Sequence, residues 1–248
     1  MTSPICLRLP KGSETYLALQ RTGYQHPANR LFRLLRLGRF YDRHLLSRVE
    51  SARTSKLERL YEQELNEDFN TIQESLPTSA ASVLDIGCGL AGIDLFLYRH
   101  YGGQVDLHLL DRDGISELYY GFHAEAAFYN SLSMAESLLT LNGVSKDRVT
   151  TYNVGQTDLP DSVRFDLIIS LISWGFHYPV STYSDLVKKS LVAGGTVILD
   201  IRKGSGGREE LSTILGTEPR ILESTSKFDR LAYKSAPGFS SASMELDP

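Results

Sequence analysis

The stretch Val83-Leu84-Asp85-Ile86-Gly87-Cys88-Gly89-Leu90-Ala91-Gly92 decides the fold class of this chain. It begins in a short apolar run, residues 82–86, and continues as residues 87–92, which have the pattern Gly-x-Gly-x-x-Gly. The apolar run predicts a buried strand, and the segment 94–101 after the glycines predicts a helix. Glycine lets a chain turn sharply and lets its backbone approach a ligand closely. The stretch therefore predicts a strand, a ligand-binding loop and a helix, in that order.

Asp85 distinguishes the two cofactors that fit such a loop, a dinucleotide and S-adenosylmethionine. It lies two residues before the first glycine, at the end of the apolar run. The pyrophosphate of a dinucleotide would lie at the helix N-terminus, where this carboxylate would repel it. S-adenosylmethionine has no phosphate, and it carries a cationic amino group and a sulfonium. Asp85 therefore favours S-adenosylmethionine, although an aspartate at this place can also cap the following turn.

A second acid, Asp111, follows the next predicted strand, residues 105–110. It comes 24 residues after Gly87. In nucleotide-binding folds an acid about 20 residues after the loop accepts the ribose hydroxyls. Both cofactors contain a ribose, so Asp111 supports nucleoside binding without choosing between them. The alternative is a turn residue in the sequence Asp-Arg-Asp-Gly at 111–114.

Predicted strands and helices alternate along most of the remaining chain. Further strands are predicted over 148–154, 165–170 and 196–201, and helices over 130–141 and 183–191. Gly194-Gly195 predicts a turn before the last of these strands. The alternation is typical of a parallel sheet with helices on both faces, in which ligands bind at the carboxyl ends of the strands. The segment 27–76 reads as helices, and a disordered tail is expected over 236–248.

Several segments resemble, in the right order, motifs of the class I S-adenosylmethionine-dependent methyltransferases. Residues 83–89 resemble motif I, Asp111 matches the ribose acid, and 165–170 and 191–198 resemble the segments at the fourth and fifth strands. The resemblance covers residues 80–234. It implies an α/β fold with a doubly wound, mostly parallel, Rossmann-like sheet of seven strands, the last of them antiparallel. Candidates for strands six and seven are 218–223 and 230–234.

The same resemblance implies S-adenosylmethionine as the cofactor and S-adenosylhomocysteine as its product. The residues that would hold it are Asp85, Gly87, Cys88, Gly89, Asp111, Arg112, Gln156 and Ser170. The chain departs from the family at Gly155, where many members have an acid that meets the adenine amine. Gln156 or the backbone would take this role instead. The carboxylates that bind a metal in catechol-type relatives are not evident, and we expect no metal.

Two histidines are candidates for a general base: His177, in the segment 173–179, and His123, in an aromatic-rich insertion over 116–130. Methyl transfer needs an aligned nucleophile, and an alcohol nucleophile also benefits from a base with a pKa near neutrality. Either histidine could instead be structural. The sequence Ser-Leu-Ile-Ser at 170–173 stands where an Asn-Pro-Pro-Tyr motif would bind a planar amino group, which argues against methylation of a nucleobase amino group. We expect an oxygen acceptor. Candidate substrate contacts are Trp174, Tyr178, Tyr120 and Arg36.

The charge pattern indicates a segment that distinguishes substrates. The formal net charge of the 248 residues is -4, but seven arginines lie between Arg21 and Arg48, and residues 58–74 are rich in acids. Such a separation of charge can mark a partner surface. We expect an N-terminal helical cap that contributes to specificity over 1–79, a cofactor-binding methyltransferase domain over 80–235, and the tail over 236–248.

We therefore expect a methyltransferase that modifies a small or medium-sized molecule. Two cysteines are too few for a disulfide framework, and no apolar run reaches the length of a membrane span, so we expect a cytoplasmic protein. Three alternatives stay open: an RNA methyltransferase, a catalytically silent subunit that binds S-adenosylmethionine, and a nicotinamide oxidoreductase. Nucleic acid is the less expected partner because the chain is slightly acidic. The oligomeric state is not predicted.

Overall fold

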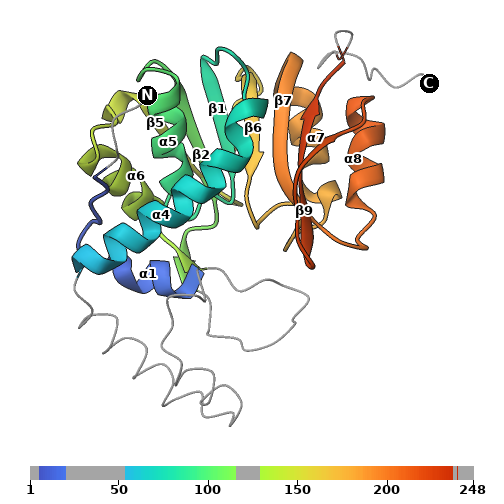
Figure 1. The fold of residues 1–248 in the computed structure, drawn as a ribbon. Helices are drawn as coiled ribbons and strands as arrows, with labels where there is room; N and C mark the ends of the chain where they lie inside the picture. Colours follow the sequence, from blue (N-terminus) through green and yellow to red (C-terminus); the bar gives the residue numbers. More distant parts are fainter. Residues whose placement is uncertain (1–5, 21–53, 116–128, 237–238, 240–248) are drawn as a thin grey trace.

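The computed structural model describes residues 6–20, 54–115, 129–236 and 239. Its centre is a sheet of seven strands in the order β5-β2-β1-β6-β7-β9-β8 (Figure 1). Neighbouring strands are parallel except at β9, which runs antiparallel to both β7 and β8. This sheet confirms the predicted α/β fold with one antiparallel strand. The strands are β1 (Ser82–Ile86), β2 (Asp106–Asp111), β5 (Val149–Asn153), β6 (Phe165–Ser170), β7 (Leu191–Arg202), β8 (Arg220–Ser224) and β9 (Phe228–Lys234).

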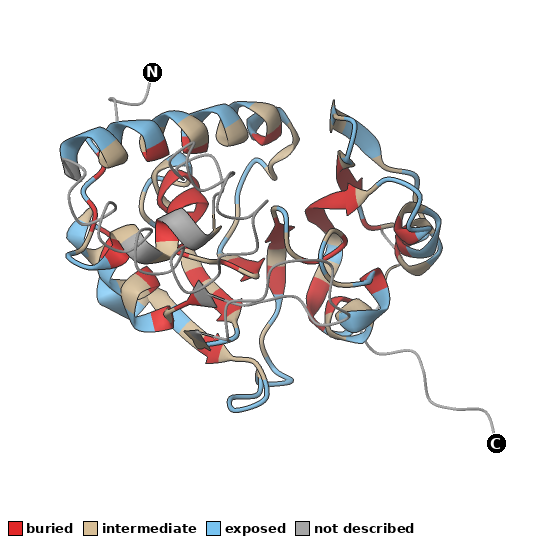
Figure 2. Ribbon diagram, turned by 90° about the horizontal axis from the view of Figure 1, so that it is seen from below, coloured by how far each residue is buried: buried red, intermediate tan, exposed pale blue. Residues whose placement is uncertain are grey.

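Helices cover both faces of the sheet. One face carries α4 (Thr54–Ile72), α5 (Gly92–His100) and α6 (Leu132–Leu141), and the other carries α7 (Ser184–Ser190) and α8 (Gly207–Leu215) (Figure 1). Each set of helices shares a hydrophobic core with the sheet. Figure 2 shows buried strands between helices whose outer surfaces are exposed. None of the helices in the described ranges is both long enough and apolar enough to cross a bilayer.

Shorter elements surround this framework. α1 (Ser13–Gln20) packs against β4 (Tyr129–Asn130), which pairs with β3 (Gly114–Ile115) outside the main sheet. The described residues also include the 3-10 turns η2 (Gln73–Ser75), η3 (Lys146–Arg148) and η4 (Val180–Thr182). These elements bring α1 and the β3–β4 pair to the carboxyl end of β2, because β3 begins three residues after β2 ends.

The central strands form as they do because their sequences are apolar at consecutive positions. Val83-Leu84 of β1 and Leu167-Ile168-Ile169 of β6 are all fully buried. An alternating strand leaves one face to solvent, whereas a continuous apolar run needs cover on both faces. The three-layer arrangement supplies this cover and leaves the loops at the carboxyl ends of the strands to form a site.

The described part of the N-terminal region packs directly on the sheet. The amides of Leu7 and Leu9 donate to the carboxylates of Glu62 and Glu58 on α4, at 3.1 and 3.0 Å. Leu7, Leu9 and Leu17 belong to the same core as α5 and α6. Residues 6–20 and α4 therefore share a core with the sheet. The role of residues 1–79 in specificity stays a prediction, and the arginine-rich segment lies outside the described residues.

Two features differ from the sequence predictions. The sequence predictions do not include the helices α1 and α8. α8 is short and lies between Gly206 and Gly216, whose φ values of 76° and 66° are left-handed. β7 begins at Leu191 instead of Thr196, because Leu191 pairs with Phe165 while Thr196 pairs with Leu167. Gly194-Gly195 therefore lies in an irregular part of the strand and not in a turn before it.

Candidate functional site

The loop that joins β1 to α5 lies at the carboxyl edge of the sheet. Gly87 has a φ of 77°, and its amide donates to the carbonyl of Leu110 in β2 at 2.7 Å. A Cβ at Gly87 would overlap with the side chain of Ser173, which follows β6. Gly89 has a φ of 55°, and a Cβ there would lie 2.9 Å from Oε1 of Gln20 at the end of α1. Both positions require glycine, since the loop turns sharply and other segments approach it closely.

The carboxylate of Asp111 is tied to this loop. Its Oδ2 accepts a 2.9 Å hydrogen bond from the amide of Gly89, and its Oδ1 accepts one of 2.7 Å from the amide of Arg112. Burial raises the pKa of Asp111 to about 6, and these two hydrogen bonds oppose that rise. A carboxylate can accept about four hydrogen bonds. Asp111 therefore keeps the capacity to accept hydroxyl groups of a ligand, as its predicted role requires.

Two further carboxyl groups are buried beside the loop. Asp85, in β1, is 3% exposed, and Asp94, in the first turn of α5, is 0% exposed. The two carboxyl groups lie close enough together for each to act on the pKa of the other. Burial, followed by the negative charge of Asp94, raises the pKa of Asp85 well above its ordinary value, and burial raises the pKa of Asp94 to about 7. The loop is therefore lined by acids that resist ionising together.

Cys88 lies among these acids. Its side chain is buried, and burial followed by the negative charges of Asp111, Asp85 and Asp94 raises the pKa of the thiol well above its ordinary value. A thiol in such surroundings stays protonated and unreactive. Cys88 is therefore suited to packing within the loop and not to nucleophilic chemistry.

The carboxyl end of β5 adds amide groups to the same edge. The Oδ1 of Asn153 accepts from the amide of Asp113 at 3.0 Å, and its Nδ2 donates to Oε1 of Gln156 at 2.9 Å. The amide of Val154 donates to the carbonyl of Asp111 at 3.0 Å. Gln156 is exposed, and Asn153 links it to the segment that follows Asp111. Gln156 stays a candidate for the adenine contact.

The segment after β6 is fixed from beneath by buried hydrogen bonds. The hydroxyl of Ser170 donates to the carbonyl of Ile86 at 2.7 Å and accepts from the amide of Trp174 at 2.8 Å. Trp174 is 0% exposed, and its indole donates to the carbonyl of Val180 at 2.9 Å. In the structure, Ser170 and Trp174 have no exposed surface for a ligand, and they hold the segment in place instead.

His177 lies in this segment, on the side of β7. Its amide donates to the carbonyl of Ser173 at 2.8 Å, and its ring lies edge-on to that of Phe176. The guanidinium of Arg202, at the end of β7, lies over the Phe176 ring. Burial and the positive charge of Arg202 lower the pKa of His177, which favours the neutral imidazole at pH 7. The neutral form is the one that can accept a proton.

Tyr178 and Tyr183 follow Trp174 along the chain. The ring of Tyr183 is edge-on to that of Trp174. Burial raises the pKa of Tyr183, and the negative charges of Tyr178 and Asp111 add to this rise. Tyr183 is therefore near enough to Tyr178 and to Asp111 for both to act on its pKa, and Tyr178 stays a predicted substrate contact.

Three predicted site residues, His123, Tyr120 and Arg36, lie outside the described residues, so their roles stay predictions. The structure adds Asp94, Asn153, Ser173 and Gln20, which the sequence predictions do not include. The sequence contains a signal for Asp94, since it is an acid within the apolar segment 92–97. All of this segment is buried in the structure. Asn153, Ser173 and Gln20 come near the site only through contacts between segments that are far apart in the chain. Within the described ranges, no group of three or more His, Cys, Asp or Glu side chains could hold a metal ion.

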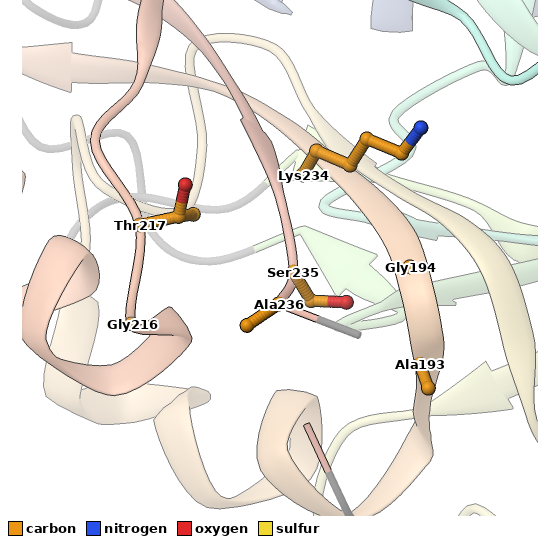
Figure 3. A pocket seen from close by; sticks show the side chains of 7 residues that line it. All are labelled: Ala193, Gly194, Gly216, Thr217, Lys234, Ser235 and Ala236. Atoms are coloured by element: carbon orange, nitrogen blue, oxygen red, sulfur yellow. The ribbon is translucent and has the colours of Figure 1, made fainter. Parts of the chain in front are cut away.

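A hollow of about 560 Å³ lies away from this loop (Figure 3). It is bounded by the first part of β7, by the end of β9 with the two residues after it, and by the two residues after α8, so it lies near the amino end of β7 and not at the carboxyl edge. Lys234 is the charged side chain among those that line it. Small side chains and backbone form the remainder, and the hollow is therefore not the candidate site. The lining residues are Ala193, Gly194, Gly216, Thr217, Lys234, Ser235 and Ala236.

No protein-family model and no curated protein matches this sequence. Solved structures do resemble it. StiE O-MT is 13% identical, with a TM-score of 0.53 over 77% of this chain and 81% of that one. A candidate O-methyltransferase from Nostoc punctiforme PCC 73102 is 15% identical, with a TM-score of 0.47 over 69% of this chain, which spans 56% of that protein. The N-methyltransferase NodS from Bradyrhizobium japonicum WM9, in complex with S-adenosyl-L-homocysteine, is 16% identical, with a TM-score of 0.47 over 71% and 87% of the two chains. The similarity to StiE O-MT confirms the Rossmann-like fold.

Proposed function

We propose that the protein is an S-adenosylmethionine-dependent methyltransferase that modifies an oxygen atom of a small or medium-sized acceptor. One observation carries the proposal: the glycine loop is lined by the carboxyl groups of Asp85, Asp94 and Asp111, and its Gly89 amide is already bonded to Asp111. A nucleoside that bears a positive charge suits this site. A nucleoside that bears a pyrophosphate does not.

The electrostatic argument depends on what acts on Asp85. The charged groups that act on its pKa are two further carboxyl groups, Asp94 and Asp111. A pyrophosphate placed at the start of α5 would add negative charge to this cluster, at a cost that burial increases. A cationic amino group would instead be attracted by it. The residues present therefore fit S-adenosylmethionine and disfavour a nicotinamide dinucleotide.

Each residue at this edge has a distinct part in holding the cofactor. Asp111 would accept the ribose hydroxyls, and Asp85 would face the amino group of the methionine part. Gln156, held by Asn153, would lie towards the adenine. When bound, the cofactor supplies a methyl group on a positively charged sulfur, which an oxygen nucleophile can displace in line.

The acceptor side would be formed by the segment after β6. Displacement by an alcohol is faster when a base removes the proton, and a neutral imidazole can do so. His177 is exposed, and partial desolvation and the positive charge of Arg202 lower its pKa, which makes it the candidate base. Tyr178, in the same segment, would contact the acceptor. The N-terminal region would complete the acceptor site.

The proposal is tested by ligand binding followed by an acceptor screen. Thermal shift and calorimetry with S-adenosylhomocysteine, S-adenosylmethionine and NAD should show binding of the first two and no binding of NAD. Methyl-labelled S-adenosylmethionine should then label one or more members of a panel of phenols, alcohols and carboxylic acids. Binding of NAD without S-adenosylhomocysteine would overturn the proposal, and labelling of amines or RNA alone would overturn the oxygen acceptor. Binding without any transfer would instead support a catalytically silent subunit.

A further inference from the structure

Asp94 is a buried acid with no hydrogen-bond donor among the residues that the structure describes. Its side chain is 0% exposed, and neither of its carboxyl oxygens has a donor among the described residues. A buried carboxylate with no donor and no positive partner is strongly unfavourable. Asp94 lies in the first turn of α5, directly after the glycine loop, and its carboxyl group meets that of Asp85. The group is therefore next to Asp85 and shielded from solvent.

The contact between Asp85 and Asp94 has one simple chemical solution. Two carboxylates have no proton to share, so each would leave the other without a donor. If one of the two carries a proton, its O–H donates to the other, and both groups are satisfied. Two carboxyl groups that share one buried site generally behave in this way, because like charges at short distance cannot both ionise.

We propose that Asp94 and Asp85 form a pair that holds one proton while the site is empty and releases it when the amino group of the cofactor binds. Asp94 is then a positioning residue, which acts on the ligand through Asp85. The proposal rests on the proposed cofactor.

The proton balance is simple. Before binding, the pair has one O–H and a single negative charge. The ligand enters with a protonated amino group, the O–H proton leaves to solvent, and both carboxylates become ionised around one ammonium. No bond to carbon is made or broken, and no oxidant or reductant takes part. Binding of the amino group is therefore accompanied by the release of about one proton at pH values where the empty pair is protonated.

Other groups near the pair have to be separated from it. Asp111 acts on Asp85 through its charge and has a raised pKa of its own, and the Cys88 thiol lies among all three acids. From α4, Tyr61 lies against Gly92 at the start of α5. The thiol stays protonated below pH 8, because burial raises the pKa of Cys88 well above its ordinary value. Asp111 is therefore the group that needs a control.

Two ligands separate the amino group from the ribose. S-adenosylhomocysteine contains both, whereas 5′-methylthioadenosine contains the ribose and has no amino acid part. Both would contact Asp111, but only the first would displace the proton of the pair. Calorimetry of the full chain in phosphate and in Tris, at pH 6, 7 and 8, counts the released protons from the difference in heat between the buffers. We expect about one more proton released for S-adenosylhomocysteine than for 5′-methylthioadenosine at pH 6.

The variant Asp94→Asn tests the pair itself. Its amide keeps the shape of the side chain and can donate to Asp85, so Asp85 would be ionised without a shared proton. We expect the wild-type affinity for S-adenosylhomocysteine to fall about tenfold more than that for 5′-methylthioadenosine between pH 8 and pH 6. In Asp94→Asn this extra loss should disappear. At pH 6 the variant should bind S-adenosylhomocysteine about tenfold more tightly than the wild type does.

The outcomes are distinguishable. Equal proton release for the two ligands, or an Asp94→Asn variant with the wild-type pH dependence, would overturn the shared proton and leave the proposed function intact. Failure of the wild type to bind either ligand at any pH would overturn the proposed function and the pair together. If Asp94→Asn does not fold, the wild-type comparison of the two ligands in two buffers still decides the question.

Discussion

The amide of Gly89 donates a 2.9 Å hydrogen bond to Oδ2 of Asp111. This bond joins the loop after β1 to the end of β2, two segments that lie 22 residues apart in the chain. It fixes the direction of the carboxylate before any ligand arrives, so less conformational freedom is lost on binding. The acid predicted to hold a ribose is thus also a support of the glycine loop.

Replacing Asp111 should weaken cofactor binding more than it weakens folding. In Asp111→Ala the ribose hydroxyls lose a charged acceptor, and hydrogen bonds to charged groups are worth about 1.5–3 kcal/mol. We expect the Kd for S-adenosylhomocysteine, measured by calorimetry, to rise by at least about tenfold. Circular dichroism should show the same secondary structure as the wild type.

Asp106→Asn is the matched control for this variant. Asp106 is the first residue of the same strand, and its carboxylate forms a half-exposed ion pair with Arg148 at 2.8 Å. Exposed ion pairs contribute only about 0–1 kcal/mol. Asp106→Asn should therefore leave the Kd unchanged, and an equal loss of affinity in both variants would assign Asp111 a structural role only.

The sequence predictions succeed where a feature depends on neighbouring residues. The apolar run of β1, the glycines that follow it and the acids that end β1 and β2 are local patterns, and the structure places all of them at one edge of the sheet. The contacts of Ser173 with Gly87 and of Gln20 with Gly89 could not be predicted, because they join segments far apart in the chain. Such contacts depend on the packing of whole elements.

Asp94 illustrates an intermediate case. An acid among apolar residues at the start of a helix is visible in the sequence, but its partner is not. The structure supplies that partner, since the first turn of α5 folds back onto the end of β1. The role of a buried acid depends on whether it meets a base, a donor or a second acid, and only the folded arrangement decides this.

The stability of the empty protein should depend on pH through this same pair. Burial raises the pKa of Asp94 from an ordinary 3.8 to about 7 and also raises that of Asp85, so the folded state binds more protons than the unfolded state between about pH 4 and 7. Stability therefore decreases as the pH rises through this range, by up to about 1.4 kcal/mol per pH unit for one proton. Urea unfolding at pH 5, 6 and 7 measures it.

The comparison with Asp94→Asn isolates the contribution of the pair. The wild type should lose stability relative to this variant as the pH rises from 5 to 7, since the variant has no shared proton to lose. The difference in unfolding free energy between the two proteins at each pH removes the contribution of histidines and of other carboxyl groups, because both proteins contain them. A constant difference between the two proteins across this range would show that the two acids titrate as in the unfolded chain.

Removing Arg230 should be strongly destabilising. Its Nε and Nη2 donate to Asp200 at 2.8 and 3.0 Å, and its Nη1 donates to Asp68 of α4 at 3.0 Å. Asp200 is 0% exposed, so Arg230→Ala leaves a buried carboxylate without its partner. Breaking a buried pair in this way costs about 3–5 kcal/mol. The free energy of unfolding in urea measures the loss.

Arg220→Ala provides the exposed counterpart. Arg220 pairs with Glu74 at 3.4 Å, and both side chains are more than half exposed. We expect a loss of no more than about 1 kcal/mol. Equal losses in Arg220→Ala and Arg230→Ala would mean that the buried network contributes nothing beyond an ordinary surface pair.

Ile172 should be replaceable by glycine at little cost. It is a β-branched residue with a φ of 61°, and its amide donates to Oδ2 of Asp200 at 3.1 Å, which helps to hold this backbone. The left-handed conformation costs an L-residue about 1–2 kcal/mol, and glycine avoids this cost.

Ile221 in β8 provides the control, because it is exposed to a similar extent but lies in a strand. Ile172→Gly should therefore be more stable than Ile221→Gly by about 1 kcal/mol or more, as measured by urea unfolding. Equal stabilities would mean that the turn at Ile172 carries no strain.

His177 should affect turnover and leave cofactor affinity unchanged. Burial and the charge of Arg202 lower its pKa, so the imidazole becomes protonated only at acid pH. If it removes the acceptor proton, kcat should rise with pH through a pKa below about 6.5 and then level off. The measurement uses an acceptor found by the labelling screen. It should be made at saturating S-adenosylmethionine, so that the titrations of Asp85, Asp94 and Asp111, which act on binding, do not enter kcat.

Two variants complete this test. His177→Ala should lower kcat by about 100-fold or more and remove the rise with pH, because general base catalysis typically contributes about 10²–10⁴-fold. His100→Ala, at an exposed histidine at the end of α5, should leave kcat unchanged. A His177→Ala variant with normal kcat would remove His177 from the mechanism and make His123 the remaining histidine candidate. A lower kcat that keeps the wild-type pH profile would instead show that His177 supports the segment after β6 without taking a proton.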